Sequence, residues 1–339
     1  MRTAMKNKDR KIIGDLITGC RKAKVLFAAV SLGVFQLTRG AGAASRSIAG
    51  KLGSDPRATE VLLNALVPMG FLRKSSGVYK NTPISDKFLL PEKSGFLGHN
   101  LLYQNILWDA WARLEQVVKR GRTDFPLRKL LSGHKGFLDG YIRGMSDIAK
   151  RPAAQIAELF PLDGAKDMLD VGGGPGTYTE ALLNKAEGLR GTILDLPETL
   201  KLTKKIFKDH PLSDRVRFQA GDYHKADLGT GAYDMVLFSN VTHDEGPAEN
   251  LSLLRKAFRA LRPGGQVIIH DFMLNREMTG PEFSALFSVH MLVYTNRGRV
   301  YSVDEYRSWL KRAGFIRLRS RGICAGADNP SMALAGRRP

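Results

Sequence analysis

One short segment near the middle of the chain, Asp170-Val171-Gly172-Gly173-Gly174-Pro175-Gly176, constrains the fold more than any other. It follows the apolar pair Met168-Leu169 and precedes a helix-forming stretch that begins at Thr177. A buried strand is therefore predicted to turn through a glycine loop into a helix. Because glycine has no Cβ atom, such a loop lets a ligand approach the backbone closely. The segment is typical of a nucleotide-type site, although a purely structural turn would have a similar composition.

Two positions of this loop select among nucleotide ligands. The dinucleotide-binding pattern requires glycine or alanine at position 177, where this chain has Thr177. Asp170 at the start of the loop would repel a pyrophosphate, whereas it would attract a ligand that carries a cationic amino acid. S-adenosylmethionine carries both an ammonium and a sulfonium group. The loop therefore favours a nucleoside ligand other than a dinucleotide, and S-adenosylmethionine fits it.

The whole chain has the length and composition of a two-domain globular protein. Its 339 residues are 43% hydrophobic and 25% charged, which is ordinary for a chain with a substantial core. No apolar run approaches the roughly 20 residues of a membrane span, and the basic segment 1–11 lacks a signal-peptide cleavage site. We expect a cytoplasmic protein without membrane contact. Cys20 and Cys324 are far apart in sequence, so neither a disulfide framework nor a zinc site is expected.

Positive charge is concentrated in the N-terminal third. The formal net charge is +19, and residues 1–100 hold 17 Lys and Arg against 6 Asp and Glu. Such an excess attracts nucleic acid, anionic lipid or an acidic substrate. No aromatic residues are interleaved with these charges, as they are in many nucleic-acid-binding surfaces. We interpret the excess as a solvated surface and do not expect nucleic acid as a partner.

Residues 1–97 have the pattern of a winged-helix domain. Apolar residues recur at helical spacing, and Ser54-Asp55-Pro56 supplies an N-cap and a first-turn proline for the third helix, which stops at Gly70. Two short strands surround the turn Ser75-Ser76-Gly77. The predicted helices are 11–37, 44–52 and the segment from 56, and the predicted strands are 71–74 and 78–81.

From Lys166 onward the chain alternates between strands and helices. This rhythm is typical of a parallel, doubly wound sheet, and two final segments are predicted to form an antiparallel hairpin at its edge. The predicted strands are 168–171, 191–195, 216–220, 233–239 and 266–271, and the hairpin is 316–321 with 331–335. Helices predicted over 98–120 and 136–160, the latter with Pro152 in or between its segments, form a linker and substrate-pocket segment over 98–160.

Two carboxylates and an aromatic ring follow the next two predicted strands. Asp195 lies 21 residues beyond Gly174, where it can accept hydrogen bonds from both ribose hydroxyls of an adenosyl group. The alternative is that Asp195 caps the helix that begins at Pro197. Asp222 can accept from the adenine amino group and Tyr223 can cover the adenine face, although Gly-Asp is also a common turn.

Five motifs in order make a resemblance specific. They are Asp170 to Gly176, Asp195-Leu196-Pro197, Gly221-Asp222, Asn240-Val241-Thr242-His243-Asp244 and Leu261-Arg262-Pro263-Gly264-Gly265. The chain resembles, from about residue 11 to 336, the S-adenosylmethionine-dependent O-methyltransferases of the caffeate, acetylserotonin and hydroxyneurosporene type. The resemblance implies an α/β fold: a Rossmann-like class I methyltransferase domain with a mostly parallel seven-stranded sheet over 161–339, preceded by an all-helical or winged-helix dimerisation domain. It also implies a homodimer formed through the N-terminal domain.

The resemblance carries site residues with it. His243 matches the general base, and its imidazole, with an ordinary pKa near 6.5, can take the proton of a phenol or enol. Asp271 is placed to orient His243. Asp244 directly follows His243 in the same motif. The implied cofactor contacts are Asp170, Gly172, Gly174, Asp195, Leu196, Asp222, Tyr223 and Ser239, together with Met145 and Ser146 of the preceding helix.

Three positions depart from the family pattern. A second carboxylate that usually flanks the histidine falls on Val300, Glu245 stands where a tryptophan is frequent, and Ser239 stands where plant members have a lysine. These departures keep open a catalytically weak or regulatory cofactor-binding homologue.

Aromatic residues and methionines suggest a flat, apolar methyl acceptor. The predicted acceptor residues are Trp108, Asn240, Phe287, Met291 and Tyr294. A helical stripe of this kind is equally typical of packing. We expect methylation of a hydroxyl on a small aromatic or polyketide-like metabolite, without a metal. A nucleic-acid methyltransferase is the other alternative, but the chain has no Asn-Pro-Pro-aromatic motif and no Pro-Cys nucleophile.

Overall fold

The computed structural model describes residues 2–127, 129, 137–327 and 329–339. These residues form two compact units, 1–108 and 109–339. The finer division predicted above, into 1–97, 98–160 and 161–339, stays a prediction.

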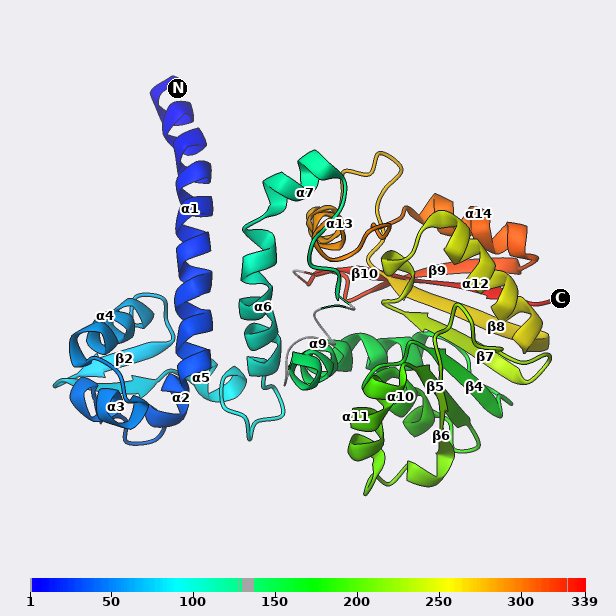
Figure 1. Cartoon of the computed structure of the whole chain (residues 1–339), viewed down its shortest axis with the longest axis horizontal. Helices are drawn as coiled ribbons and strands as arrows, with labels where there is room; N and C mark the ends of the chain where they lie inside the picture. The colour runs from blue at the N-terminus through cyan, green and yellow to red at the C-terminus, as the bar shows by residue number, and fades with distance from the viewer. Residues whose placement is uncertain (1, 128, 130–136, 328) are drawn as a thin grey trace. The chain divides into compact units, whose positions relative to one another are not determined.

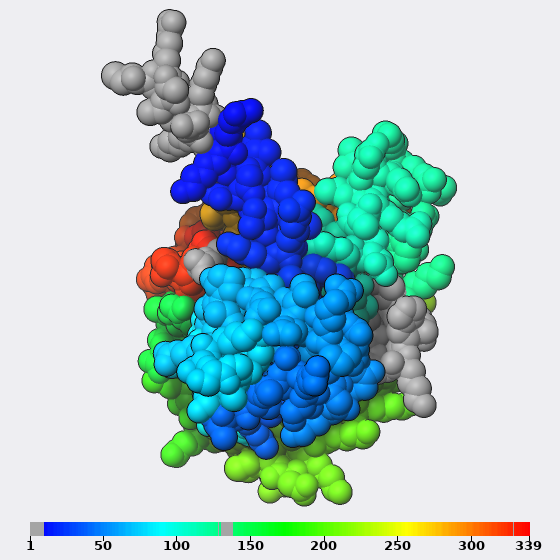
Figure 2. All heavy atoms as spheres, turned by 90° about the vertical axis from the view of Figure 1, so that its left-hand side faces the viewer, coloured from blue at the N-terminus to red at the C-terminus, as the bar shows by residue number. Residues whose placement is uncertain are grey.

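The first unit is mainly helical and contains a small antiparallel sheet of order β1-β3-β2. Its elements are α1 (Arg2–Leu32), α2 (Val34–Leu37), β1 (Ala43–Ala44), α3 (Ser45–Leu52), α4 (Pro56–Leu66), β2 (Leu72–Ser75), β3 (Val78–Asn81), α5 (Pro83–Phe88) and most of α6 (Gly98–Trp111). Phe35, Ile48, Leu63 and Tyr79 are fully buried in its core. Figure 2 shows α3, α4 and the β2–β3 hairpin as one compact block, in light blue to cyan, with the described part of α1 extending beyond it.

The sequence located most of these elements, with several differences. α1 begins at Arg2 rather than at residue 11, α4 ends at Leu66 rather than at Gly70, and α5 was not predicted. Asp55 caps α4 by accepting from Ala58 N at 2.7 Å, which confirms the predicted N-cap. The helix expected over 11–37 is broken at Gly33, whose φ of 78° interrupts it before α2. β1 was not predicted, because two residues carry no periodic signal.

The second unit begins with helices. The helix expected over 98–120 is two helices, because α6 ends at Trp111 and α7 (Leu114–Arg120) begins after a turn. The next helix, α9 (Phe137–Leu159), contains Pro152 in its interior. Its predicted first residue, 136, lies outside the described residues.

A seven-stranded sheet of order β6-β5-β4-β7-β8-β10-β9 forms the centre of this unit (Figure 1). The strands are β4 (Asp167–Val171), β5 (Arg190–Asp195), β6 (Val216–Ala220), β7 (Tyr233–Ser239), β8 (Leu261–Asp271), β9 (Ile316–Ile323) and β10 (Ser331–Arg337). β4 to β8 pair in parallel, and β10 pairs antiparallel with both β8 and β9. The predicted mostly parallel sheet and its antiparallel hairpin are therefore confirmed.

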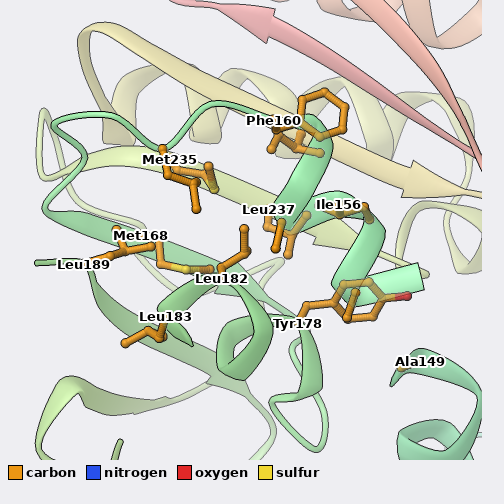
Figure 3. Close-up of a cluster of buried hydrophobic side chains, with 14 of the residues drawn as sticks. Ala149, Ile156, Phe160, Met168, Tyr178, Leu182, Leu183, Leu189, Met235 and Leu237 are labelled. Atoms are coloured by element: carbon orange, nitrogen blue, oxygen red, sulfur yellow. The ribbon is translucent and has the colours of Figure 1, made fainter. Parts of the chain in front are cut away.

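Both faces of the sheet are covered by helices, which explains why its central strands are almost continuously apolar. The remaining helices are α10 (Thr177–Lys185), α11 (Pro197–Phe207), α12 (Pro247–Ala260), α13 (Glu282–Tyr294) and α14 (Val303–Ala313), with the 3₁₀ turns η1 (Ser213–Arg215) and η2 (Thr242–Asp244). Figure 3 shows Ile156 of α9, Phe160 just after that helix and Leu182 of α10 over Met235 and Leu237 on one face. On the other face α12 and α14 contribute the buried Leu254, Tyr306 and Trp309.

This topology gathers the carboxyl ends of β4, β5, β6, β7 and β8 at one edge of the sheet, which is where open α/β sheets bind ligands. None of the described helices combines the length and apolarity needed to cross a membrane.

Candidate active site

The glycine loop after β4 is built partly by packing and partly around open space. Gly172, Gly174 and Gly176 all have positive φ, at 69°, 53° and 79°. A Cβ atom at Gly172 would come within 2.7 Å of Val241, and one at Gly176 within 2.6 Å of Phe207. At Gly174 a Cβ would meet nothing within 4 Å. The loop therefore packs tightly at both ends and leaves room at Gly174, as a ligand cradle requires.

Asp195 at the end of β5 is fixed against this loop. One carboxylate oxygen accepts from Gly174 N at 2.8 Å, and the other accepts from Leu196 N at 2.7 Å. Burial raises the pKa of Asp195, while these backbone donors act in the opposite direction. Each oxygen of a carboxylate can accept a second hydrogen bond. The side chain can therefore hold a pair of hydroxyl groups without moving.

Asp170 lies beneath the loop and is fully buried. One oxygen accepts from Thr179 Oγ1 at 2.7 Å, and the other, Oδ1, is buried without a hydrogen-bond partner in the described part of the chain. Burial is the main cause that raises its pKa to about 7. A carboxylate with a bare buried oxygen suits a cationic ligand, so the donor set fits S-adenosylmethionine.

The remaining predicted cofactor residues lie around the same edge. Asp222 accepts from His224 N at 3.0 Å. Tyr223 approaches the loop, since a Cβ at Gly172 would lie 3.9 Å from its ring. Ser146 on α9 accepts from Thr177 Oγ1 at 3.3 Å, one residue along from the half-buried Met145.

The α9 residue Tyr141 was missed by the sequence reasoning. Burial raises the pKa of its hydroxyl, and the nearby charges of Asp244 and Asp195 raise it further. Tyr141 therefore experiences the charges of both Asp244 and Asp195. A single tyrosine at helical spacing gives no signal in sequence that separates it from a packing residue.

His243 and Asp271 form a buried pair. His243 Nδ1 lies 2.6 Å from Asp271 Oδ1, and His243 Nε2 lies 3.9 Å from Asp244 Oδ1. Burial lowers the pKa of His243, but Asp271 and then Asp244 outweigh it and raise the pKa to about 9. His243 sits in η2 directly after β7, and Asp271 ends β8, the neighbouring strand.

Asp271 is held in place by four donors. It accepts from His243 Nδ1, Phe272 N at 2.8 Å, Thr242 Oγ1 at 2.7 Å and Tyr306 OH at 3.2 Å. Burial acts to raise the pKa of Asp271, but His243 and then the Thr242 hydroxyl outweigh it and keep the pKa below its usual value. The carboxylate therefore stays ionised and cannot rotate. Val300, at the position expected for a second carboxylate, is fully buried and donates its N–H to Ser288 Oγ at 3.3 Å.

A second histidine, His270, organises a polar group behind the loop. Its Nδ1 lies 3.0 Å from Ser239 Oγ and 3.2 Å from Tyr178 OH, and its Nε2 lies 2.8 Å from Ser331 Oγ. Burial lowers its pKa to about 4, so the ring is neutral. Ser239, predicted as a cofactor contact, is thus a buried partner of His270. His270 was not predicted as a site residue, because a single histidine in an apolar strand is also typical of a core residue.

Aromatic rings on α13 line up beside His243. The Phe287 ring is edge-on to His243 at 5.0 Å and stacks on His290 at 5.2 Å. His290 in turn lies 5.8 Å from Trp111 and 4.5 Å from Tyr294, whose hydroxyl is buried and without a partner in the described ranges. The predicted residues Phe287 and Tyr294 therefore lie beside Trp111 and His290, two residues that were not predicted as acceptor residues.

The other predicted acceptor residues have different surroundings. Met291 is buried on α13. Asn240 has a φ of 54°, and its Oδ1 is buried without a partner among the residues described. Trp108 belongs to the first unit, where it packs edge-on against Phe27 at 6.1 Å. Its place in an acceptor pocket stays a prediction.

Comparison with known proteins identifies the protein family to which the chain belongs. Residues 111–316 match the O-methyltransferase domain, and residues 15–91 match the O-methyltransferase dimerisation domain. The chain belongs to the O-methyltransferase family. It is an S-adenosylmethionine-dependent enzyme with the class I methyltransferase fold.

Similar O-methyltransferases span almost the whole chain. The 3-hydroxy-5-methyl-1-naphthoate 3-O-methyltransferase of Streptomyces sahachiroi is 29% identical over 91% of this chain and 90% of its own length. The acetylserotonin O-methyltransferase of Bos taurus is 30% identical over 91% and 93%. A solved structure described as PigF with SAH is 27% identical, has a TM-score of 0.85 and covers 97% of this chain and 99% of its own.

Proposed function

We propose that this O-methyltransferase methylates a hydroxyl group of a small aromatic or polyketide-like metabolite, with His243 as the general base. The observation that supports this most is the 2.6 Å contact between His243 Nδ1 and Asp271 Oδ1. A carboxylate acceptor keeps the proton on Nδ1, so Nε2 is the nitrogen that can accept a proton. S-adenosylmethionine supplies a methyl group activated by the sulfonium charge.

The chemistry required of the protein is modest. Displacement at a sulfonium has a good leaving group, so the protein contributes alignment and deprotonation. With the cofactor bound, His243 Nε2 would take the proton of the acceptor hydroxyl as its oxygen replaces the sulfur on the methyl carbon. Asp271 then stabilises the imidazolium that results.

The acceptor class is inferred from the rings around His243. Phe287 and His290 are stacked, with Trp111 beside His290, which gives an aromatic wall suited to a flat ring. Two of the relatives are named for a naphthoate and for acetylserotonin. These names and the aromatic wall together support a fused or substituted aromatic acceptor.

We assign the cofactor to the edge that runs from the glycine loop to Asp222. Gly174 offers open space, Asp195 offers a fixed pair of oxygens and Asp170 offers a buried negative charge. In this assignment Asp195 takes the ribose hydroxyls, and Asp222 and Tyr223 take the adenine. Asp170 lies toward the cationic amino acid.

We further propose that two copies of the chain pair through the N-terminal domain. One face of α1 exposes Ile12, Ile13, Leu16 and Ile17 at 53% to 71%. Contiguous exposed apolar residues of this kind mark an interaction surface. A second copy is the occupant we assign, because residues 15–91 match the dimerisation domain of the family.

The variant His243→Ala tests the assignment of the base. Loss of a general base lowers kcat about 10²- to 10⁴-fold, while the affinity for S-adenosylhomocysteine stays as in the wild type because the glycine loop and Asp195 are untouched. Turnover of a phenolic acceptor panel and calorimetry with S-adenosylhomocysteine measure the two effects.

His210→Ala provides a matched control. His210 is a partly exposed histidine paired with Glu180, and its removal leaves both kcat and cofactor affinity unchanged. Wild-type turnover in His243→Ala would show that another group takes the proton. A wild type that binds cofactor and methylates no member of the panel would favour the regulatory homologue.

A further inference from the structure

Glu245, two residues after His243, joins two segments that are distant in the sequence. Its Oε1 accepts a hydrogen bond from Tyr223 OH at 2.6 Å, and His224 Nε2 lies 2.9 Å from the same oxygen. The Glu245 side chain is only 14% exposed. An ionised carboxylate is an acceptor only, so it matches the tyrosine hydroxyl and a protonated Nε2. Tryptophan, frequent at this position in the family, could make neither contact.

The Tyr223–Glu245 contact crosses the edge of the sheet. Tyr223 follows β6 and Glu245 follows β7, and in the order β6-β5-β4-β7 two strands lie between them. Adjacent strands are about 4.8 Å apart, so three spacings correspond to roughly 14 Å. The contact therefore bridges the carboxyl ends of β5, which carries Asp195, and β4, which carries the glycine loop.

The Tyr223 ring stands directly beside the glycine loop. A Cβ atom at Gly172 would lie 3.9 Å from Tyr223 Cε1 and 2.7 Å from Val241. The ring thus forms a side wall of the space at the carboxyl end of β4. The ring packs against the apolar cluster that contains Val241, and the hydroxyl contact to Glu245 further restricts rotation of the side chain about χ1 and χ2.

Both ends of the bridge are anchored to the backbone. Lys256 Nζ on α12 donates to the carbonyl oxygens of Tyr223 at 2.8 Å and His224 at 3.2 Å. The carbonyl oxygen of Glu245 accepts from Tyr301 OH at 2.5 Å. With the backbone fixed on each side, the side-chain contact is the part that can be removed without moving the loops.

From this geometry we propose that Glu245 is a positioning residue for the cofactor. It holds the Tyr223 ring as a wall of the cofactor site and ties that wall to the loop that carries His243. The inference rests on the proposed function, because it takes the cofactor to lie between the glycine loop, Asp195 and Tyr223. A ring released from Glu245 has to be ordered again on each binding event, and ordering a side chain weakens binding.

The test compares the variants Glu245→Gln and Glu245→Ala. Each is made once in the wild-type background and once together with Tyr223→Phe. The glutamine amide oxygen still accepts from the tyrosine hydroxyl, whereas alanine does not. With Tyr223 present, Glu245→Ala binds S-adenosylhomocysteine about tenfold more weakly, equivalent to about 1.4 kcal/mol, and Glu245→Gln recovers most of that affinity. With Tyr223→Phe, the difference in affinity between the two Glu245 variants shrinks to what the His224 contact contributes, because the Tyr223 hydroxyl is gone.

Steady-state kinetics separate positioning from a general structural effect. The KM for S-adenosylmethionine follows the loss of affinity, while kcat stays within about twofold because the His243–Asp271 pair is intact. Glu277→Gln, at an exposed glutamate in the segment after β8, is the matched control and leaves both constants unchanged. Thermal unfolding of each variant checks folding, and Tyr223→Phe, which removes one oxygen, by itself weakens cofactor binding.

If the affinity for S-adenosylhomocysteine differs between Glu245→Gln and Glu245→Ala by the same factor with Tyr223 and with Tyr223→Phe, the proposal is overturned. Unchanged cofactor affinity in Tyr223→Phe would overturn it as well, as would a fall in kcat with unchanged affinity. Failure of the proposed function appears elsewhere, as wild-type turnover in His243→Ala.

Discussion

At the scale of single residues, two buried histidines on either side of the sheet have pKa values shifted in opposite directions. His270 and Asp271 are adjacent in β8, so their side chains point to opposite faces of the sheet. Asp271 meets His243 and raises its pKa to about 9, whereas His270 meets only hydroxyl groups and burial lowers its pKa to about 4. One ring is therefore ready to carry a proton, and the other is a neutral structural partner.

The pH dependence of the reaction follows from this pair. Since the folded pKa of His243 lies above its ordinary value of 6.5, the pair stabilises the fold fully below pH 6.5, and this contribution is lost as pH rises through about 9. Only neutral His243 can accept a proton, so the rate rises with pH toward the same value. A bound sulfonium repels the imidazolium and lowers the pKa in the cofactor complex.

A pH–rate profile and an NMR titration of His243 measure these effects. Asp271→Asn removes the charge that holds the proton, so the apparent pKa moves to lower pH while kcat falls. An apparent pKa that stays in place in this variant would contradict the assignment to His243. S-adenosylhomocysteine, which lacks the sulfonium charge, lowers the pKa less than S-adenosylmethionine does.

At the scale of elements, α14 supports the site from a distance. Its start is a capping box, in which Ser302 Oγ accepts from Glu305 N at 3.3 Å and Glu305 Oε2 accepts from Ser302 N at 2.8 Å. This fixes the first turn, which carries Tyr306, and Tyr306 OH donates to Asp271. A helix terminus thereby restricts Asp271, a carboxylate that it does not adjoin in sequence.

Ser302→Ala tests the importance of this cap. Loss of an N-cap hydroxyl costs about 1 kcal/mol of stability, and the midpoint of urea unfolding falls accordingly. Ser308→Ala, at an exposed position of the same helix, leaves the midpoint unchanged or slightly raised because alanine favours helix. Equal midpoints for the two variants would show that the cap has no such effect.

Elements with strong local signals were predictable, and contacts between them were not. β7 was predicted to the residue, and α4 was located by Asp55 and Pro56, because periodicity and caps are local properties. His270, His290 and Tyr141 were missed, since their surroundings come from strands and helices far away in sequence. His243 and Asp271 were found through motif order, and only the structure joins them at 2.6 Å.

At the scale of the whole molecule, the exposed apolar face of α1 is typical of a surface that another chain covers. Four exposed apolar residues between 12 and 17 lie on one side of α1. Association of two chains removes this surface from water, at roughly 25 cal/mol per Å² of apolar area.

Leu16→Asp tests the proposed homodimer. Leu16 is 71% exposed, and a charge there is costly to bury, so the variant sediments as a monomer at concentrations at which the wild type is a dimer. Thr18→Asp places the same charge on the opposite side of α1, also at an exposed residue, and leaves the dimer intact. A dimeric Leu16→Asp protein would place the interface elsewhere.

The position of β10 between β8 and β9 has a consequence for biosynthesis. Residues 331–337 emerge from the ribosome after every other strand of the sheet, yet they pair with both the strand that ends in Asp271 and its hairpin partner. Until they arrive, β8 presents an open edge and His270 lacks Ser331. The open edge of β8 and the Ser331 contact of His270 are therefore completed only after all five parallel strands have been synthesised.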